Sequence, residues 1–232
     1  MLSVIIPVLE EAATVETALR ALAPLRARGV EIIVVDGGSH DDTAARAAPL
    51  AERVVVSPRG RAMQMNAGAA VARGEVLLFL HADTRLPPDA DRIVLDAIAG
   101  TRRAWGRFDV TIEGRHPLLP VIAAAMNARS RLTGITTGDQ AMFVTRAAFA
   151  AAGGFPAIAL MEDITFASTL KRISQPISLR ARVTTSGRRW ETRGVVRTIL
   201  LMWRLRLMYF FGATPDELAR RYGYAPNDGQ AA

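Results

Sequence analysis

The sequence lacks several features that mark particular classes of protein. Its 232 residues include no cysteine, which excludes disulfides, thiolate nucleophiles and cysteine-ligated zinc. No apolar run reaches the roughly 20 residues of a membrane-spanning helix. No basic leader follows Met1, as a signal peptide would require. These absences predict a cytoplasmic protein.

Lysine is almost absent as well, because Lys171 is the only one, and arginine carries the net charge of +7. A coding bias would explain most surface arginines, but guanidinium groups also bind phosphate and carboxylate with paired hydrogen bonds. The charge could attract nucleic acid, an anionic membrane or an anionic substrate. No arginine-rich arm with interleaved aromatic residues is present, so we expect no nucleic-acid partner.

Half of the residues are hydrophobic, which is enough for a sizeable core. Short apolar runs bounded by breakers predict strands at residues 3–8, 31–35, 53–56, 76–80, 105–113, 141–144 and 177–185. Helical spacing predicts helices at residues 14–25, 41–48, 61–72, 89–99, 118–132, 146–151, 162–172, 199–211 and 215–222. Strands that alternate with short helices predict an α/β fold with a parallel, doubly wound sheet.

Two of the apolar strand runs end in acidic residues. Residues 77–80 lead into His81 and Asp83, and residues 31–35 lead into Asp36. Open α/β sheets bind ligands at the edge formed by the carboxyl ends of their strands. The two acidic strand ends therefore predict a site for a metal-bound phosphate or a sugar nucleotide.

Several further motifs follow in a fixed order. They are SVIIPVLEE at 3–11, VDGGSHDDT at 35–43, RAMQMNAG at 61–68, HAD at 81–83, GGF at 153–155 and MED at 161–163. In this order they resemble the family 2 glycosyltransferases of the GT-A fold. The motifs GDQ at 138–140, LMED at 160–163 and SGRRWE at 186–191 also resemble a bacterial branch described as radical-SAM/selenodomain-associated glycosyltransferases.

The resemblance covers nearly the whole chain. It implies a Rossmann-like GT-A sheet flanked by helices, with a C-terminal helical extension. We expect one domain at 1–225, with a nucleotide-binding half at 1–88, an acceptor half at 89–192 and C-terminal helices at 193–225, followed by a frayed tail at 226–232. The implied reaction is an inverting, divalent-metal-dependent transfer of a sugar from a nucleotide-diphosphate sugar to an acceptor hydroxyl, with the acceptor and the oligomeric state left open.

For the donor nucleoside, the resemblance places Pro7, Glu10 and Asp36 around uridine or guanosine. A carboxylate at the end of a strand can accept hydrogen bonds from a base or a ribose. Asp36 could equally be a turn residue, because aspartate favours such positions.

Arg61 begins a predicted helix, whose N-terminus attracts anions, and it could bind donor phosphate or simply be solvated. Gln64 and Asn66 follow on the same helix and are expected to line the donor groove. Asn66 could instead be an ordinary surface amide.

Asp83 is the expected ligand of Mn²⁺ or Mg²⁺, because these cations prefer oxygen ligands and keep substrate phosphates in their coordination shell. The metal would act as a Lewis acid on the departing diphosphate. His81 replaces the first aspartate of the family's Asp-x-Asp motif. It could bind the metal, which Mn²⁺ would tolerate better than Mg²⁺, or bind phosphate, or shape the loop.

Asp163 is the expected general base, with Glu162 in support. Both carboxylates begin a predicted helix, where the helix dipole favours negative charge. The same position suits a plain N-cap residue.

Asp139 and Gln140 are expected to hold hydroxyls of the acceptor or of the donor sugar, although Asp139 could be a turn residue ahead of a strand. Arg188, Arg189 and Trp190 follow a strand end. They could close over the diphosphate or stack on a sugar, or they could pack as an arginine–tryptophan pair.

The helix from Ile199 to Phe211 combines apolar and basic residues. Such a helix can lie on the inner face of an anionic membrane as a peripheral contact. It can also pack on the domain with its arginine stems over apolar surface.

Two alternatives to the transferase remain at this stage. One is a non-catalytic nucleotide-sugar binding protein, which the substituted His81 keeps open. The other is a nucleotidyltransferase on a related fold. That class carries a glycine-rich basic loop after its first strand, whereas residues 7–11 are acidic and contain no glycine.

Overall fold

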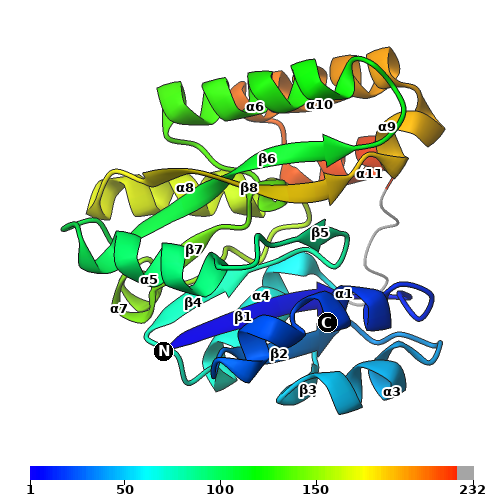
Figure 1. Cartoon of the computed structure of the whole chain (residues 1–232). Coiled ribbons are helices and arrows are strands. Elements are labelled where there is room, and N and C mark those ends of the chain that lie inside the picture. The colour runs from blue at the N-terminus through cyan, green and yellow to red at the C-terminus, as the bar shows by residue number, and fades with distance from the viewer. Residues whose placement is uncertain (224–232) are drawn as a thin grey trace, which may run out of the picture.

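The computed structural model describes residues 1–223, which form an eight-stranded mixed sheet flanked by helices (Figure 1). The tail expected at 226–232 lies outside the described residues. The strands follow the spatial order β3-β2-β1-β4-β7-β6-β8-β5. They are β1 (Leu2–Val8), β2 (Glu31–Asp36), β3 (Arg53–Val56), β4 (Val76–Phe79), β5 (Thr84–Arg85), β6 (Trp105–Glu113), β7 (Phe143–Thr145) and β8 (Ile177–Ser186).

Most neighbouring strands run parallel, which confirms the predicted α/β class. β1 is parallel to β2 and β4, and β2 is parallel to β3. β6 and β8 are also parallel, whereas β7 and β5 run antiparallel to their neighbours. The carboxyl ends of β1, β2 and β4 therefore meet at one edge of the sheet, where the loops with Glu10, Gly37 and His81 begin.

The helices connect the strands and cover the sheet. They are α1 (Val15–Ala21), α2 (Ala23–Ala27), α3 (Thr43–Ala47), α4 (Arg61–Val71), α5 (Ala90–Ala99), α6 (Leu119–Thr133), α7 (Arg146–Ala151), α8 (Glu162–Ile173), α9 (Arg188–Arg193), α10 (Val195–Phe210) and α11 (Pro215–Tyr222), with 3₁₀ turns η1 (Ala48–Leu50) and η2 (Gly138–Gln140).

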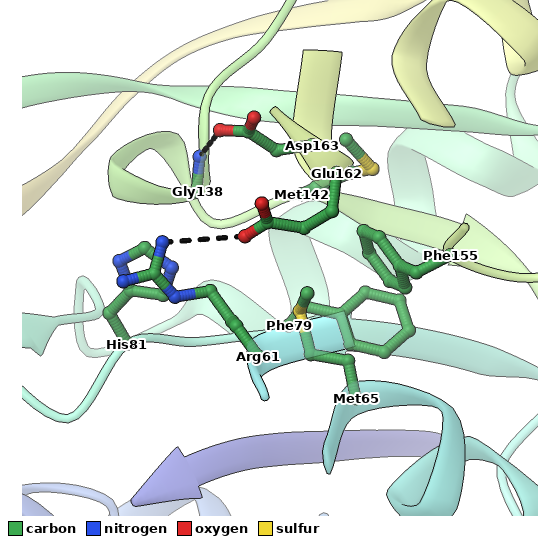
Figure 2. A pocket seen from close by; sticks show the side chains of 9 residues that line it. All are labelled: Arg61, Met65, Phe79, His81, Gly138, Met142, Phe155, Glu162 and Asp163. Carbon is green, nitrogen blue, oxygen red and sulfur yellow. Dashed lines mark hydrogen bonds and ion pairs between the residues drawn. The ribbon is translucent and has the colours of Figure 1, made fainter. Parts of the chain in front are cut away.

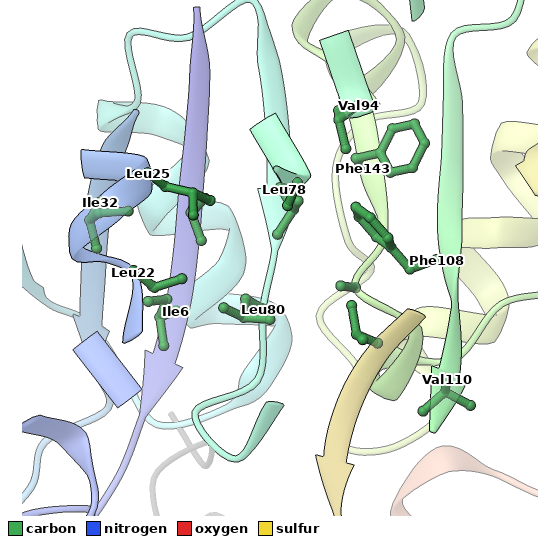
Figure 3. Packing of buried hydrophobic residues seen from close by; sticks show 14 of the residues in the cluster. Ile6, Leu22, Leu25, Ile32, Leu78, Leu80, Val94, Phe108, Val110 and Phe143 are labelled. Carbon is green, nitrogen blue, oxygen red and sulfur yellow. The ribbon is translucent and has the colours of Figure 1, made fainter. Parts of the chain in front are cut away.

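The central strands are buried on both faces, which explains their continuous apolar sequences. Ile6 packs in one buried cluster with Leu78 and Phe108 (Figure 3). Its neighbour Ile5 packs in a second cluster with Leu77. Successive side chains of a strand point to opposite faces, so β1 and β4 each supply both clusters.

Several predicted elements have other bounds in the structure, and α10, for example, begins at Val195 rather than at residue 199. The helix predicted at 14–25 is divided into α1 and α2, because the chain turns at Leu22 and Pro24 lies in the first turn of α2. The strand predicted at 141–144 begins later, as β7, because η2 precedes it and Ala141 adopts a φ of 46°.

β5 and α9 were not predicted. β5 is a two-residue strand that exists through its pairing with β8, where Thr84 lies opposite Thr185. α9 begins directly after β8, at Arg188.

The C-terminal helices form a third buried cluster with the segment that precedes α8. Leu160 and Met161 pack there against Leu205 of α10 and Leu218 of α11. The extension thus reaches the start of α8. Within residues 1–223, no helix combines the length and apolar character needed to cross a bilayer.

Candidate active site

A small pocket lies where the start of α4, the end of β4, the η2 loop and the start of α8 meet (Figure 2). Its volume is about 10 Å³, close to the space that one water molecule needs. Its apolar lining residues are Met65, Phe79, Met142 and Phe155. The other lining residues are Arg61, His81, Gly138, Glu162 and Asp163.

Asp163 is held by two backbone donors. The nitrogen of Gly138 donates to its Oδ2 at 2.9 Å, and the nitrogen of Ile164 donates to its Oδ1 at 2.7 Å. The cap position of α8 belongs to Met161, with a φ of 71° and no side-chain cap bond. Asp163 is therefore not the plain N-cap that its sequence position also suited.

Glu162 is only 3% exposed and lies beside Arg61, with 3.4 Å between Oε1 and Nη1 (Figure 2). Burial raises the pKa of its carboxyl, the charge of Arg61 partly opposes the rise, and the neighbouring Asp163 adds to it. Glu162 therefore holds a proton more readily than an ordinary glutamate.

His81 contacts the η2 loop. Its Nδ1 lies 3.4 Å from Oδ1 of Asp139. A Cβ atom at Gly138 would lie 2.2 Å from Nε2 of His81, so only glycine allows the ring to pack there. Both ring nitrogens face residues 138–139.

The pKa of Asp139 is lowered overall. Burial works against its ionisation, but the hydrogen bond and charge of His81, with the charges of Arg61 and Arg189, outweigh it. Asp139 is thus an ionised carboxylate that attracts His81 after β4, Arg61 of α4 and Arg189 of α9.

Asp83 is exposed and follows β4 by a few residues. Thr84 Oγ1 donates to its Oδ1 at 3.3 Å, and Ser186 anchors its backbone oxygen at 3.1 Å. Over residues 1–223, no three histidine or acidic side chains cluster closely enough to hold a metal by themselves. An exposed carboxylate does fit Mg²⁺ or Mn²⁺ sites that take most of their ligands from substrate phosphates and water.

The residues expected to bind the nucleoside lie along the same sheet edge, outside the pocket. Asp36 is 3% exposed and accepts from Ser39 three times, twice from its nitrogen, at 3.1 and 3.2 Å, and once from its hydroxyl, at 2.5 Å. Asp36 therefore acts as a turn residue, because its carboxylate holds Ser39. Pro7 is half-buried in β1, opposite Val35 of β2.

Glu10 joins the loops after β1 and β2. Its Oε1 accepts from the nitrogen of His40 at 2.8 Å, and its own nitrogen donates to Ser39 Oγ at 2.9 Å. Its φ of 54° is unusual for a residue with a side chain. The two bonds hold this conformation.

The side chains of Gln64 and Asn66, expected to line the donor groove, bind backbone atoms instead. Nε2 of the buried Gln64 donates to the carbonyl oxygens of Val8, at 2.8 Å, and Val35, at 2.9 Å. Asn66 donates to the oxygen of Phe155 at 2.8 Å and accepts from its nitrogen at 2.9 Å. They fix the ends of β1 and β2 and the glycine turn before α8.

Comparison with known proteins assigns the chain to a family. Residues 3–151 match the family described as Glycosyl transferase family 2. The chain belongs to this family. Its mixed sheet with flanking helices is the GT-A fold, as predicted.

Curated relatives match part of the chain. An uncharacterized protein, MT1568, from Mycobacterium tuberculosis (strain CDC 1551 / Oshkosh) is 39% identical over 95 residues, 39% of this chain and 30% of that protein. A PGL/p-HBAD biosynthesis glycosyltransferase from Mycobacterium bovis (strain BCG / Pasteur 1173P2) is 40% identical over 93 residues, 37% of this chain and 36% of that protein. The match thus spans about a third of the length of these relatives.

Solved structures share the fold at low identity. S. aureus TarS 1-349 in complex with UDP has a TM-score of 0.63 and 18% identity, with 80% of this chain and 60% of that chain covered. Glucosyl-3-phosphoglycerate synthase from Mycobacterium tuberculosis, with Mn²⁺ and UDP-glucose, has a TM-score of 0.59 and 20% identity, with 80% and 70% covered.

The remaining family-motif residues lie around the site with mixed roles. Gln140 is fully buried and forms a capping box with Thr137. Arg188 is exposed, and the Arg189 guanidinium lies 5.0 Å from the ring centre of Tyr222. Trp190 packs against the main buried cluster, so the arginine stacks on a tyrosine of α11 and not on tryptophan.

Two arginines that the sequence does not single out, Arg129 of α6 and Arg206 of α10, lie within electrostatic range of Asp163. Two guanidinium nitrogens of Arg129 and one of Arg206 are buried without a hydrogen-bond partner among residues 1–223. On the sequence they look like other arginines on amphipathic helices. Only the packing of α6 and α10 shows that they are desolvated.

Proposed function

We propose that this protein transfers a sugar from a nucleotide-diphosphate sugar to an acceptor hydroxyl, with inversion at the anomeric carbon. The observation that carries the proposal is the pocket in which Arg61, His81, Glu162 and Asp163 meet from three separate segments. It lies at the carboxyl edge of the sheet, where α/β folds bind ligands. Family membership and the UDP and UDP-glucose complexes of the two structural neighbours support this reading.

In this mechanism Asp163 takes the proton of the acceptor hydroxyl. The oxygen then forms a bond to the anomeric carbon while the bond from that carbon to the diphosphate breaks. The nucleotide diphosphate leaves with the electron pair, and attack from the opposite side inverts the centre. The bonds from Gly138 and Ile164 hold the Asp163 carboxylate in place.

Asp83 would hold Mn²⁺ or Mg²⁺ together with the donor phosphates. When bound, the metal supplies positive charge beside the leaving diphosphate. Arg61, at the start of α4, adds a protein charge on the same side. The contacts of His81 with Asp139 and Gly138 favour a loop-shaping role over metal binding.

The nucleoside would lie over the ends of β1 and β2, beside Pro7, Glu10 and Asp36. We assign residues 1–88 to the donor and residues 89–192 to the acceptor within one domain at 1–225. Asp139, Arg188, Arg189 and Trp190 would then face the diphosphate or the acceptor. Gln140 would support this loop from inside.

We also place the protein in the radical-SAM/selenodomain-associated branch. Three motifs support this assignment, at 138–140, 160–163 and 186–191. A reading frame for a radical-SAM protein beside this gene would agree with it, and a consistently unrelated gene neighbourhood in close homologues would contradict it.

We further propose peripheral contact of α10 with an anionic membrane. The residues of one α10 stripe remain exposed at spacings of three and four. They are Val196, Leu200, Trp203, Leu207 and Phe210. Arg197 and Arg204 are exposed on the same helix, so apolar and basic groups lie together, as in interfacial helices. The opposite side of α10 packs inward through Leu205.

The deciding experiment is a thermal-shift screen of UDP, GDP and their sugars with and without Mn²⁺, followed by a transfer assay. A ligand that binds the native state raises its melting temperature by mass action. We expect a shift with one nucleotide that grows with Mn²⁺ in the wild type, and an increment from Mn²⁺ that disappears in Asp83→Ala. No shift with any nucleotide would contradict the donor assignment. Binding without transfer or hydrolysis would favour a non-catalytic binding protein.

A further inference from the structure

Two arginine side chains from different helices are desolvated beside the proposed base. Nε and Nη2 of Arg129 and Nε of Arg206 are buried and have no hydrogen-bond partner within residues 1–223. A buried donor that lacks an acceptor loses its bonds to water without replacement. Such groups in a folded protein call for an explanation, and a bound ion is one of them.

The two guanidinium groups also act on each other. The pKa of Arg129 is lowered to about 10, mainly by burial and also by the charge of Arg206, although Asp163 and Asp139 partly oppose the shift. Burial likewise lowers the pKa of Arg206, and the same two carboxylates raise it. Both cations therefore lie within electrostatic range of Asp163 and Asp139, and Arg206 repels Arg129.

The packing of the C-terminal helices on α8 brings Arg206 within range of Asp163. Thr165 Oγ1 of α8 and the hydroxyl of Tyr209 in α10 are 2.6 Å apart. Leu205 packs in the cluster that contains Met161, two residues before Asp163. α6 packs on the same buried cluster as the start of α10, through Ile122 and Val195 (Figure 1).

Stability does not explain the pair. Like charges whose buried nitrogens lack acceptors, as at Arg129 and Arg206, cost folding free energy, and apolar side chains of similar size often stabilise such sites. The donor diphosphate already has its own groups in the proposed function, Asp83 with its metal and Arg61. A second cationic pair within electrostatic range of Asp163 points to a second anion.

We propose that Arg129 and Arg206 bind a phosphate group of the sugar acceptor, next to the hydroxyl from which Asp163 takes the proton. This inference rests on the proposed transfer reaction. A phosphate carries a charge of about −1.5 to −2 and three acceptor oxygens, which matches two guanidinium groups. The acceptor is thus a phosphorylated alcohol, either a soluble molecule or the headgroup of a lipid.

The first test is calorimetric titration of the protein with glycerol 3-phosphate, and separately with inorganic phosphate. We expect the wild type to bind the organic phosphate. Arg129→Gln and Arg206→Gln should each weaken binding by about tenfold or more, because each loses a charge-assisted hydrogen bond. The exposed Arg220 of α11 provides the matched control, and Arg220→Gln should bind like the wild type.

The lipid source is tested with phosphatidylcholine vesicles that contain or lack phosphatidylglycerol. If the lipid headgroup is the natural acceptor, binding that depends on Arg129 and Arg206 should occur with phosphatidylglycerol vesicles and be weak with glycerol 3-phosphate. The reverse pattern assigns a soluble acceptor. The proposal is overturned if the wild type binds neither the vesicles nor glycerol 3-phosphate. It is also overturned if Arg129→Gln and Arg206→Gln bind as well as the wild type.

A stability measurement separates a ligand role from a structural one. Without ligand, Arg129→Met and Arg206→Met should unfold at the same or a higher temperature than the wild type, because each removes an unpartnered buried charge. A clear drop in melting temperature for both would assign the arginines to the fold and overturn the proposal. The same measurement also shows that the variants fold.

UDP binding in the same variants distinguishes this inference from the proposed function. Normal UDP-induced thermal shifts with lost phosphate binding support an acceptor subsite. Loss of the UDP shift in the arginine variants would assign them to the donor diphosphate and overturn the acceptor proposal alone. Absence of any nucleotide shift in the wild type would contradict the transferase itself.

Discussion

Asp163 accepts a hydrogen bond from the backbone nitrogen of Gly138 at 2.9 Å, which connects the start of α8 with the η2 loop. The same glycine lies against the ring of His81, whose Nδ1 faces Asp139. The proposed base Asp163 and the histidine after β4 therefore both contact the short loop that carries Asp139. A change in this loop is expected to affect donor and acceptor sides together.

Replacement of Asp163 by asparagine tests the base. Asp163→Asn keeps an oxygen for one of the two backbone donors but cannot take a proton. We expect normal folding and a loss of transfer of about 10²–10⁴-fold. Steady-state transfer and the melting temperature measure the two effects, and Asp96→Asn, at an exposed position of α5, is the control. Wild-type turnover in Asp163→Asn would remove Asp163 from this role.

Glu162 should make stability depend on pH. Its pKa is raised in the folded state, mainly by burial. Its contribution to stability is therefore complete below its unfolded pKa and is lost as the pH rises through its folded pKa. Glu162→Gln, which stays neutral, should be more stable than the wild type above that range, and the difference should close at acidic pH.

Urea unfolding over a pH series measures this difference. Glu75→Gln, the same substitution at an exposed position, is measured alongside for comparison. A gap between Glu162→Gln and the wild type that stays constant with pH would show that burial does not control the ionisation of Glu162.

Two adjacent glycines should differ in their tolerance of alanine. Gly153 and Gly154 have φ values of 77° and 74°, so a side chain at either position costs about 1–2 kcal/mol. At Gly154 a Cβ atom would also lie 2.8 Å from Oδ1 of Asn66, whereas nothing lies within 4 Å of it at Gly153. Gly154→Ala should therefore lose about 1 kcal/mol more than Gly153→Ala, through the disturbed Asn66–Phe155 bonds.

The free energies of unfolding of the two variants in urea test this order. In an Asn66→Ala background the clash is absent, and the two alanine substitutions should cost the same. An equal cost in the presence of Asn66 would show that the turn does not depend on that side chain.

The exposed stripe of α10 should bind anionic vesicles. Trp203 and Phe210 are 73% and 82% exposed. The variant with Trp203→Gln and Phe210→Gln should lose most co-sedimentation with phosphatidylglycerol vesicles, and salt should weaken wild-type binding through screening of the arginines. Val56 of β3 is 71% exposed and lies outside α10, so Val56→Gln is the control. If the wild type stays in the supernatant at low salt, the membrane contact is excluded.

The strands could be predicted because their signal is local. β2 and β4 are continuous apolar runs, since each strand is covered on both faces, and the turn residues after them mark their ends. The start of α11 is equally local, because Thr214 caps it and Pro215 occupies its first turn. In contrast, β5 forms only through its pairing with β8, which no neighbouring residue encodes.

The same distinction applies to the site. Sequence order alone put Asp36, His81 and Asp83 beyond the ends of parallel strands and Asp163 at the start of a helix, because periodicity and chain breakers act over a few residues. Tertiary packing decided that His81 meets Asp139, that Gln64 binds two strand ends and that Arg129 and Arg206 are desolvated near Asp163. These contacts join residues far apart in the chain, and burial and electrostatic energy depend on what surrounds a side chain in space, not on its neighbours in sequence.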